Sequence, residues 1–324
     1  MRIRKILLFT FAAVLIAAVV PGAHAADAFP TKPIQLVIPF APGDTDQMLR
    51  PFSDRMGEFL GHPVVMNYKP GAAGSVGSGF VAASNPDGYT IVGSSPSSLV
   101  VVPLTNKEIK YNLDSFQPVA GLSAGAFLIV VQAASPYKNL KDLVEHAKKA
   151  PGTVTFSTSG PMSLPQLLAE IFSQKAGIKL MHIPYQGSGP AVTAVLSGNV
   201  DMASTAIAPA MAQIKAGTLR ALAVINNKRL KAFPDVPTLT EEGYNIDADL
   251  SISYGILAPK GTPREIVGAL SNAAHKVIEK YGDQVGQTLS LVGAEVRFLG
   301  PDEYGAYLKN QEQLFSAAIK NLNN

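Results

Sequence analysis

Residues 34–61 read IQLVIPFAPGDTDQMLRPFSDRMGEFLG and decide the class of fold. Their largely apolar start at 34–38 predicts a strand. Turn-forming residues follow at 39–44, and residues 46–60 predict an amphipathic helix that ends at Gly61. A strand, a polar turn and a helix in this order form the repeating unit of α/β proteins.

The same unit recurs along the chain. Further strands are predicted at residues 64–66, 89–92, 127–131, 154–156, 180–183, 200–203, 221–225 and 253–257. Further helices are predicted at residues 140–150, 164–176, 191–196 and 263–280, and from 302 onward. This alternation predicts an α/β architecture with mainly parallel sheets.

The units fall into two series, with a late strand and helices left over, which predicts two lobes. We expect one lobe to comprise residues 26–125 and 252–324 and the other to comprise residues 126–251, with crossings near Gly125 and Ser251. Ligands of open α/β sheets bind at the carboxyl ends of the strands. The sequence therefore predicts a ligand cleft between lobes that close by hinge motion.

The first 25 residues have the composition of a signal peptide. A basic start is followed by an apolar run too short to span a bilayer and by the small-x-small pattern Ala23-His24-Ala25. We expect cleavage before Ala26 and export to the periplasm. This segment holds three of the 27 Lys and Arg residues and none of the 24 Asp and Glu residues, so the mature chain balances at 24 of each. Nucleic acid is therefore not an expected partner.

Three patterns associated with catalysis or cofactors lack the context that they need. The GLSAG motif at 121–125 resembles a serine-hydrolase elbow, but a strand rather than a helix is predicted after it. The glycines at 71–79 fit neither dinucleotide-binding nor phosphate-binding loops. The histidines outside the signal are scattered, and His182 is interpreted as structural. We therefore expect no enzyme activity, no metal and no cofactor.

Three polar loops share one place in the predicted topology, after a strand and before a helix. They span residues 40–46, 93–98 and 157–163. Helix N-termini leave N–H groups unpaired and carry partial positive charge, so such loops can hold a carboxylate without Lys or Arg. The candidate ligand-binding residues in them are Phe40, Ala41, Gly43, Asp44, Thr45, Asp46, Ser94, Ser95, Ser159, Gly160, Pro161 and Met162.

Seven blocks of sequence resemble one known family, in the family's order and across nearly the whole chain after residue 28. They are FPTKPI with VIPFAPG (29–34 and 37–43), PGAAG (70–74), PDGYT (86–90), HIPYQG (182–187), KAGTLRALAV (215–224), PDVPT (234–238) and APKGTP (258–263). Together they resemble the substrate-binding receptors of tripartite tricarboxylate transporters, also called the Bug family.

This resemblance implies a two-lobed type II periplasmic binding fold with the ligand cleft between the lobes. It also implies a carboxylate ligand, such as an organic acid, an amino acid or an aromatic acid, held largely by backbone amides and water. It further implies membrane transporter subunits as partners. We expect the receptor itself to be a monomer. Tyr185, Thr205 and Ala206 join the candidate ligand-binding residues on this basis.

Two positions depart from the family's pattern. The turn at Gly43-Asp44-Thr45-Asp46 is shorter and carries an extra carboxylate, and Thr205-Ala206 stands where many relatives have Asp-Asn. Asp44 either caps the following helix, which is the favoured interpretation, or faces the ligand and selects for an amino or hydroxyl group. The sequence thus predicts an exported carboxylate receptor for a transporter, with a ligand sensor for a two-component sensor kinase as the alternative.

Overall fold

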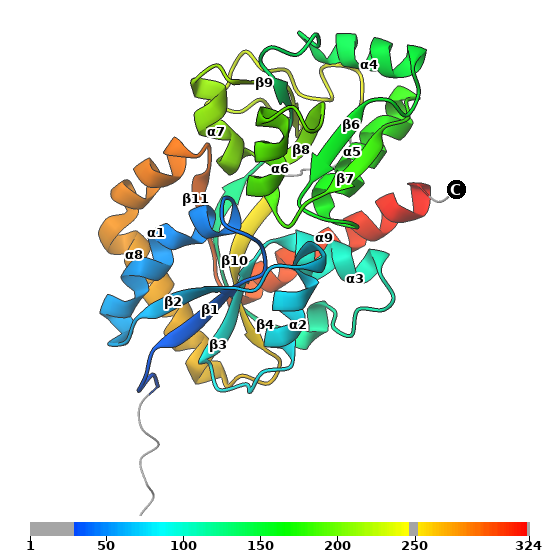
Figure 1. Cartoon of the computed structure of the whole chain (residues 1–324). Helices are drawn as coiled ribbons and strands as arrows, with labels where there is room; N and C mark the ends of the chain where they lie inside the picture. Colours follow the sequence, from blue (N-terminus) through cyan, green and yellow to red (C-terminus); the bar gives the residue numbers. More distant parts are fainter. Residues whose placement is uncertain (1–28, 246–251, 323–324) are drawn as a thin grey trace, which may run out of the picture.

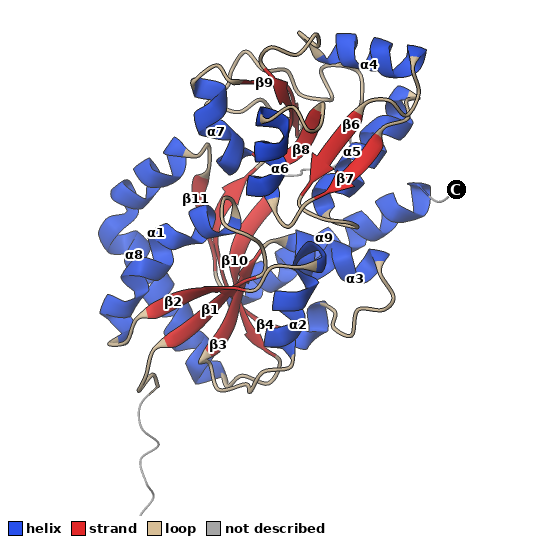
Figure 2. Ribbon diagram, viewed as in Figure 1, coloured by secondary structure: helices blue, strands red, loops and turns tan. Residues whose placement is uncertain are grey.

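The computed structural model describes residues 29–245 and 252–322. Two sheets, each covered by helices, form two lobes that are stacked one above the other in Figure 1. Figure 2 shows the six-stranded sheet in the lower lobe and the five-stranded sheet in the upper lobe. The predicted signal peptide, the cleavage site before Ala26 and the predicted crossing at Ser251 lie outside the described residues.

The first lobe is built on a six-stranded sheet. Its strands are β1 (Ile34–Ile38), β2 (Val64–Tyr68), β3 (Thr90–Ser94), β4 (Phe116–Gly125), β10 (Ile252–Pro259) and β11 (Glu295–Leu299), in the order β11-β4-β10-β3-β1-β2. The helices that pack on it are α1 (Thr45–Leu60), α2 (Ser75–Ala82), α8 (Arg264–Leu291) and α9 (Pro301–Leu322). Short helical segments are η1 (Ala72–Gly74), η2 (Ser97–Val101), α3 (Val102–Thr105) and η3 (Leu113–Ser115).

The second lobe is built on a five-stranded sheet. Its strands are β5 (Phe127–Gln132), β6 (Thr155–Thr158), β7 (Met181–Pro184), β8 (Met202–Ala206) and β9 (Leu219–Ile225), in the order β7-β6-β8-β5-β9. Its helices are α4 (Leu140–Lys149), α5 (Leu164–Ala176), α6 (Ser188–Leu196) and α7 (Ile207–Lys215). Helix α9, red in Figure 1, contacts β4 in the first lobe and α5 in the second.

The chain passes between the sheets at two places. It leaves the six-stranded sheet at Gly125 and enters the five-stranded sheet at Phe127, and it returns between β9 and β10. One buried apolar cluster includes residues of both sheets. The division into residues 26–125 with 252–324 and residues 126–251 remains our proposal for the lobe boundaries.

The prediction of mainly parallel sheets is wrong, because both sheets are mixed. Strand β1 pairs parallel with β2 and β3, and β6 pairs parallel with β7 and β8. The pairs β3-β10, β4-β10, β4-β11, β5-β8 and β5-β9 are antiparallel. The sequence analysis treated every strand as part of a parallel crossover unit, whereas the strands that carry the chain between lobes run against their neighbours.

Strands β4 and β11 were not predicted. Strand β4 contains Pro118, Gly121 and Gly125, residues that usually punctuate a strand, and its pairing with β10 tolerates them through register shifts. The GLSAG motif falls inside β4, and β5 follows it. The hydroxyl of Ser123 is buried and donates to the carbonyl of Met48, which gives this serine a structural role.

Helix α1 fixes the position of the loop that precedes it. Met48, Leu49, Phe52 and Met56 form its buried face, and Gly61 ends it in a left-handed conformation with φ of 77°. Because this face is anchored in the core, the helix start at Thr45 is held beside the second lobe. Among residues 29–245 and 252–322, none of the helices combines the length and apolarity needed to cross a bilayer.

Candidate ligand-binding site

A small cavity lies where the two lobes meet. Four of the predicted ligand-binding residues line it, namely Phe40, Asp44, Ser95 and Ser159, together with Ser97, Phe127, Pro165 and Ser188. These lining residues come from both lobes. The space open to the centre of a water molecule is about 10 Å³, close to the smallest volume that holds one water. A ligand of several heavy atoms therefore requires the lobes to move apart before it binds.

The lining combines hydroxyl groups with the starts of helices. Ser95, Ser97, Ser159 and Ser188 are each at most 5% exposed, so their hydroxyls are shielded from bulk water. Helix α1 begins directly after Asp44, α6 begins at Ser188, and Pro165 belongs to the first turn of α5. Three helix N-termini thus approach one cavity, and each offers N–H groups and partial positive charge.

One of these helix ends already holds an oxygen atom. The N–H of Leu164, the first residue of α5, donates to the hydroxyl oxygen of Ser97 over 3.1 Å. Ser97 belongs to the first lobe and Leu164 to the second, so this bond crosses the cleft. The start of α5 thus donates a hydrogen bond to an oxygen atom of the opposite lobe.

The prediction that Asp44 caps α1 is wrong. Within the described chain its side chain makes no capping hydrogen bond, although Asp44 occupies the capping position. Both carboxyl oxygens instead accept from the Tyr254 hydroxyl, each over 3.2 Å. The residue retains some exposed surface, while its carboxyl group is enclosed by protein. That burial raises the pKa of Asp44 to about 7. The hydrogen bond from Tyr254 lowers this pKa and the negative charge of Asp46 raises it, and both effects are smaller than that of burial.

Asp46, rather than Asp44, stabilises the start of α1. Its Oδ1 accepts from the N–H of Gly43 over 2.8 Å, and its Oδ2 accepts from the hydroxyl of Tyr68 over 3.1 Å. Asp46 is 7% exposed and lies in the first turn of α1, where a negative charge complements the helix dipole. Its two oxygens thus tie the loop before α1 to the end of strand β2.

The two lobes touch through backbone atoms. The N–H of Ala41 donates across the cleft to the carbonyl of Gln186 over 2.9 Å. Gly43 has φ of 128°, and a β-carbon there would lie 2.9 Å from the Cα of Gly189. Gly160 has φ of 144°, and a β-carbon there would lie 2.9 Å from the Cα of Ala73. Only glycine permits approaches this close in these conformations.

Comparison with known proteins identifies the family. A family model described as "Tripartite tricarboxylate transporter family receptor" matches residues 48–323. The chain belongs to this receptor family. The resemblance stated from the sequence blocks is therefore confirmed, and so is the two-lobed periplasmic binding fold.

Relatives of the receptor match it over most of their length. Protein BugT of Bordetella pertussis is 32% identical over 298 residues, which cover 91% of this chain and 90% of BugT. The structure of periplasmic binding protein BugD has a TM-score of 0.85 and 29% identity, and covers 91% of this chain and 99% of its own. An R. palustris protein solved with adipate has a TM-score of 0.83 and 25% identity, with coverage of 91% and 98%.

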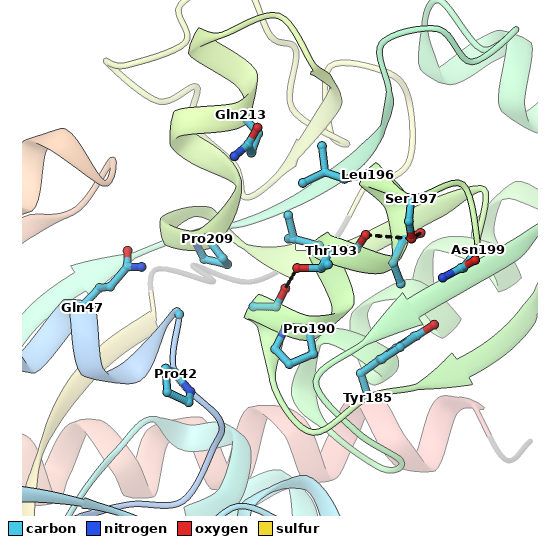
Figure 3. Close-up of a pocket in the computed structure, with 14 residues that line it drawn as sticks. Pro42, Gln47, Tyr185, Pro190, Thr193, Leu196, Ser197, Asn199, Pro209 and Gln213 are labelled. Carbon is cyan, nitrogen blue, oxygen red and sulfur yellow. Dashed lines mark hydrogen bonds between the residues drawn. The ribbon is translucent and has the colours of Figure 1, made fainter.

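A second, larger groove lies on the outside of the receptor. Its volume is about 640 Å³. It is bordered by Pro42, Gly43 and Gln47 from the first lobe and, from the second, by Tyr185 just after β7 and by residues of α6, of the turn after α6 and of α7. Figure 3 shows Tyr185 at one edge of this groove and Gln213 at another. The predicted residues Gly43 and Tyr185 thus line the outer groove, not the inner cavity.

The remaining predicted residues of the receptor lie near the cleft without lining the cavity. Ser94 is buried in β3 with its hydroxyl bonded to that of Ser98 over 2.7 Å. Pro161 and Met162 are exposed, and the carbonyl of Met162 accepts from the Thr105 hydroxyl of the other lobe. Buried positions in the cleft wall or the adjoining strand are occupied by Thr45, Thr205 and Ala206.

Four cavity residues were missed by the sequence analysis as ligand contacts. Ser97 lies in a loop that was singled out, and Ser188 follows the HIPYQG block at the start of α6, so the strand-loop-helix rule had a signal for both. Phe127 and Pro165 gave no such signal, because one begins a strand and the other lies inside a helix. Their place in the cavity depends on how the lobes meet.

His182 has the structural environment that was predicted for it. It is half-buried, its Nε2 lies 2.7 Å from the Thr158 hydroxyl, and its ring contacts Phe156. Burial lowers the pKa of His182, which favours the neutral ring. In the described part of the receptor, no group of three or more potential metal-binding side chains comes together.

Proposed function

We propose that this receptor captures a small carboxylate-bearing metabolite outside the cytoplasmic membrane and delivers it to membrane transporter subunits. The observation that carries the proposal is the cavity between the lobes, where hydroxyl groups and the starts of α1, α5 and α6 converge. Such a lining binds anionic oxygens through hydrogen bonds and helix dipoles, without a cationic side chain.

The family relationship supports the same proposal. The family's description places its members as receptors of a transport system, and one relative was solved with adipate, a dicarboxylate. The contact between the Leu164 N–H and the Ser97 hydroxyl supports an oxygen ligand at the start of α5. The proposal also includes three further points. The protein is exported through a signal peptide at residues 1–25, it is a monomer, and it performs no catalysis.

Capture proceeds in three steps in this account. A carboxylate enters between separated lobes and accepts hydrogen bonds from the backbone N–H groups of one lobe. The second lobe then closes, bringing its own helix starts and hydroxyls to the remaining oxygens. Each hydrogen bond to a charged acceptor contributes about 1.5–3 kcal/mol, so a handful supports roughly micromolar affinity after the cost of association.

We expect at least one small carboxylic acid to stabilise the purified mature protein in a thermal-shift screen. A ligand that binds the folded state alone raises the melting temperature, and the rise grows with the logarithm of ligand concentration once that concentration exceeds the Kd. The screen contains monocarboxylates, dicarboxylates and amino acids, with the amide of each acid as a matched control, and titration calorimetry then measures affinity. Amides that stabilise as well as their acids, or a complete screen with no stabilising acid, contradict the proposed function.

A further inference from the structure

We propose that Asp44 makes this receptor selective for carboxylates that also carry an ammonium group. The inference rests on the proposed function, because it concerns the second group of the ligand that the same cavity holds. Among the eight side chains that line the cavity, Asp44 is the charged one, and the others are serine, phenylalanine and proline. Asp44 therefore determines which charge a ligand group next to it can carry.

The carboxyl group of Asp44 has hydrogen-bonding capacity to spare. An ionised carboxylate offers about four acceptor positions, and among the described residues Tyr254 is the partner assigned to it, with two 3.2 Å contacts from a single hydroxyl. Asp46, two residues along, contrasts with it, because donors of the protein occupy both of its oxygens. Of these two neighbouring acids, Asp44 is the one free to contact a ligand.

A structural role does not account for Asp44. Within the described chain it makes no cap for α1, and the ion pairs found there do not include it. Enclosing an ionised carboxyl group without a cation costs free energy, which a neighbouring positive charge offsets. A ligand cation placed in the cavity supplies that charge.

The rest of the lining determines the other half of the ligand. The starts of α1, α5 and α6 favour negative charge, whereas Asp44 favours positive charge. A molecule with a carboxylate and an ammonium on nearby atoms satisfies both. A second carboxylate beside Asp44 is repelled unless Asp44 is protonated, and a hydroxyl leaves the charge of Asp44 uncompensated.

Protonation of Asp44 gives the inference a distinct signature. The pKa of about 7 means that Asp44 is about half protonated in the free receptor at pH 7. Its titratable neighbours are Asp46 on α1 and Tyr254 on β10, and burial holds the pKa of Tyr254 well above its usual value. A ligand ammonium favours ionised Asp44, so binding at pH 7 releases about half a proton, and affinity rises between pH 6 and pH 8.

The test uses pairs of acids that differ by an α-amino group: propionate with L-alanine, succinate with L-aspartate, glutarate with L-glutamate, and adipate with L-2-aminoadipate. Titration calorimetry in buffers of different ionisation enthalpy measures affinity and proton release for the wild type, Asp44→Asn and Asp54→Asn. Asp54 is an exposed acid on the same helix and serves as the matched control. Melting temperatures confirm that each variant is folded.

We expect the amino member of the bound pair to bind wild type and Asp54→Asn at least about tenfold more tightly than its amine-free partner, with proton release. Asp44→Asn should abolish both the preference and the proton release. Tighter binding of the amine-free acid to wild type, or proton uptake on binding, overturns the inference and leaves the proposed function standing. If another acid from the screen binds but no member of any pair does, the inference fails and the proposed function stands; if no acid in the complete screen binds, the proposed function fails as well.

Discussion

Replacing Gly43 with valine is expected to weaken carboxylate binding by about tenfold to a hundredfold. At φ of 128° a β-branched residue is strained, and its β-carbon would lie 2.9 Å from the Cα of Gly189 on the opposite lobe. Strain of this kind costs about 1–3 kcal/mol, and the atom that it meets is backbone, which cannot rotate away. The substitution therefore opposes closure of the lobes over the ligand.

Two measurements check this prediction: titration calorimetry for affinity and small-angle scattering for closure. The radius of gyration of the wild type should fall when ligand saturates it, whereas that of Gly43→Val should stay near the open value. Gly61→Val is the matched control, because Gly61 also has positive φ, at the other end of α1, with nothing within 4 Å of its β-carbon position. Equal loss of affinity in both variants would show that strain rather than closure is responsible.

Replacing Asp44 with asparagine is expected to stabilise the folded protein at pH 8. The pKa of Asp44 is about 7 in the folded state and 3.8 in the reference state, so between these values the folded state binds more protons than the unfolded state. Stability then falls as pH rises from about 4 to about 7 and stays low above that. Asparagine mimics the neutral acid and avoids this loss, which amounts to about 2–4 kcal/mol.

The difference in melting temperature between Asp44→Asn and wild type reports this effect. We expect the variant to melt several degrees higher at pH 8 and at the same temperature as wild type near pH 4, when both are measured by scanning calorimetry without ligand. Asp54→Asn should show no comparable rise, since Asp54 is exposed. A melting-temperature difference that does not change with pH would contradict the burial of an ionisable carboxyl group at Asp44.

The sequence predicted the local units well and their long-range relations less well. The loops at 40–46 and 157–163 were found because a strand, a small polar turn and a helix are adjacent in the chain. For Asp44 the favoured interpretation, a helix cap, was wrong, because its partner Tyr254 lies 210 residues away and the capping preference of aspartate is a local rule. Similarly, Phe127 enters the cavity through the packing of two lobes, which no local pattern records.

Strand direction was a second limit of the sequence analysis. Local pattern identifies a strand but does not say which neighbour it pairs with, so β5 was placed among parallel strands although it pairs antiparallel with β8 and β9. Strand β4 was missed because its glycines and Pro118 weaken the local signal, while β10 and β11 supply the pairing from far along the chain. Tertiary pairing overrides local preference in both cases.

A crystal structure of the mature protein with a bound carboxylic acid from the screen tests the central claim most directly. The account predicts the ligand between the lobes, with its carboxylate oxygens within hydrogen-bonding distance of backbone N–H groups at the starts of α1, α5 or α6 and of the Ser95, Ser97, Ser159 or Ser188 hydroxyls. A carboxylate paired with a lysine or arginine side chain, or a ligand bound outside the cavity that contains Asp44, would contradict it.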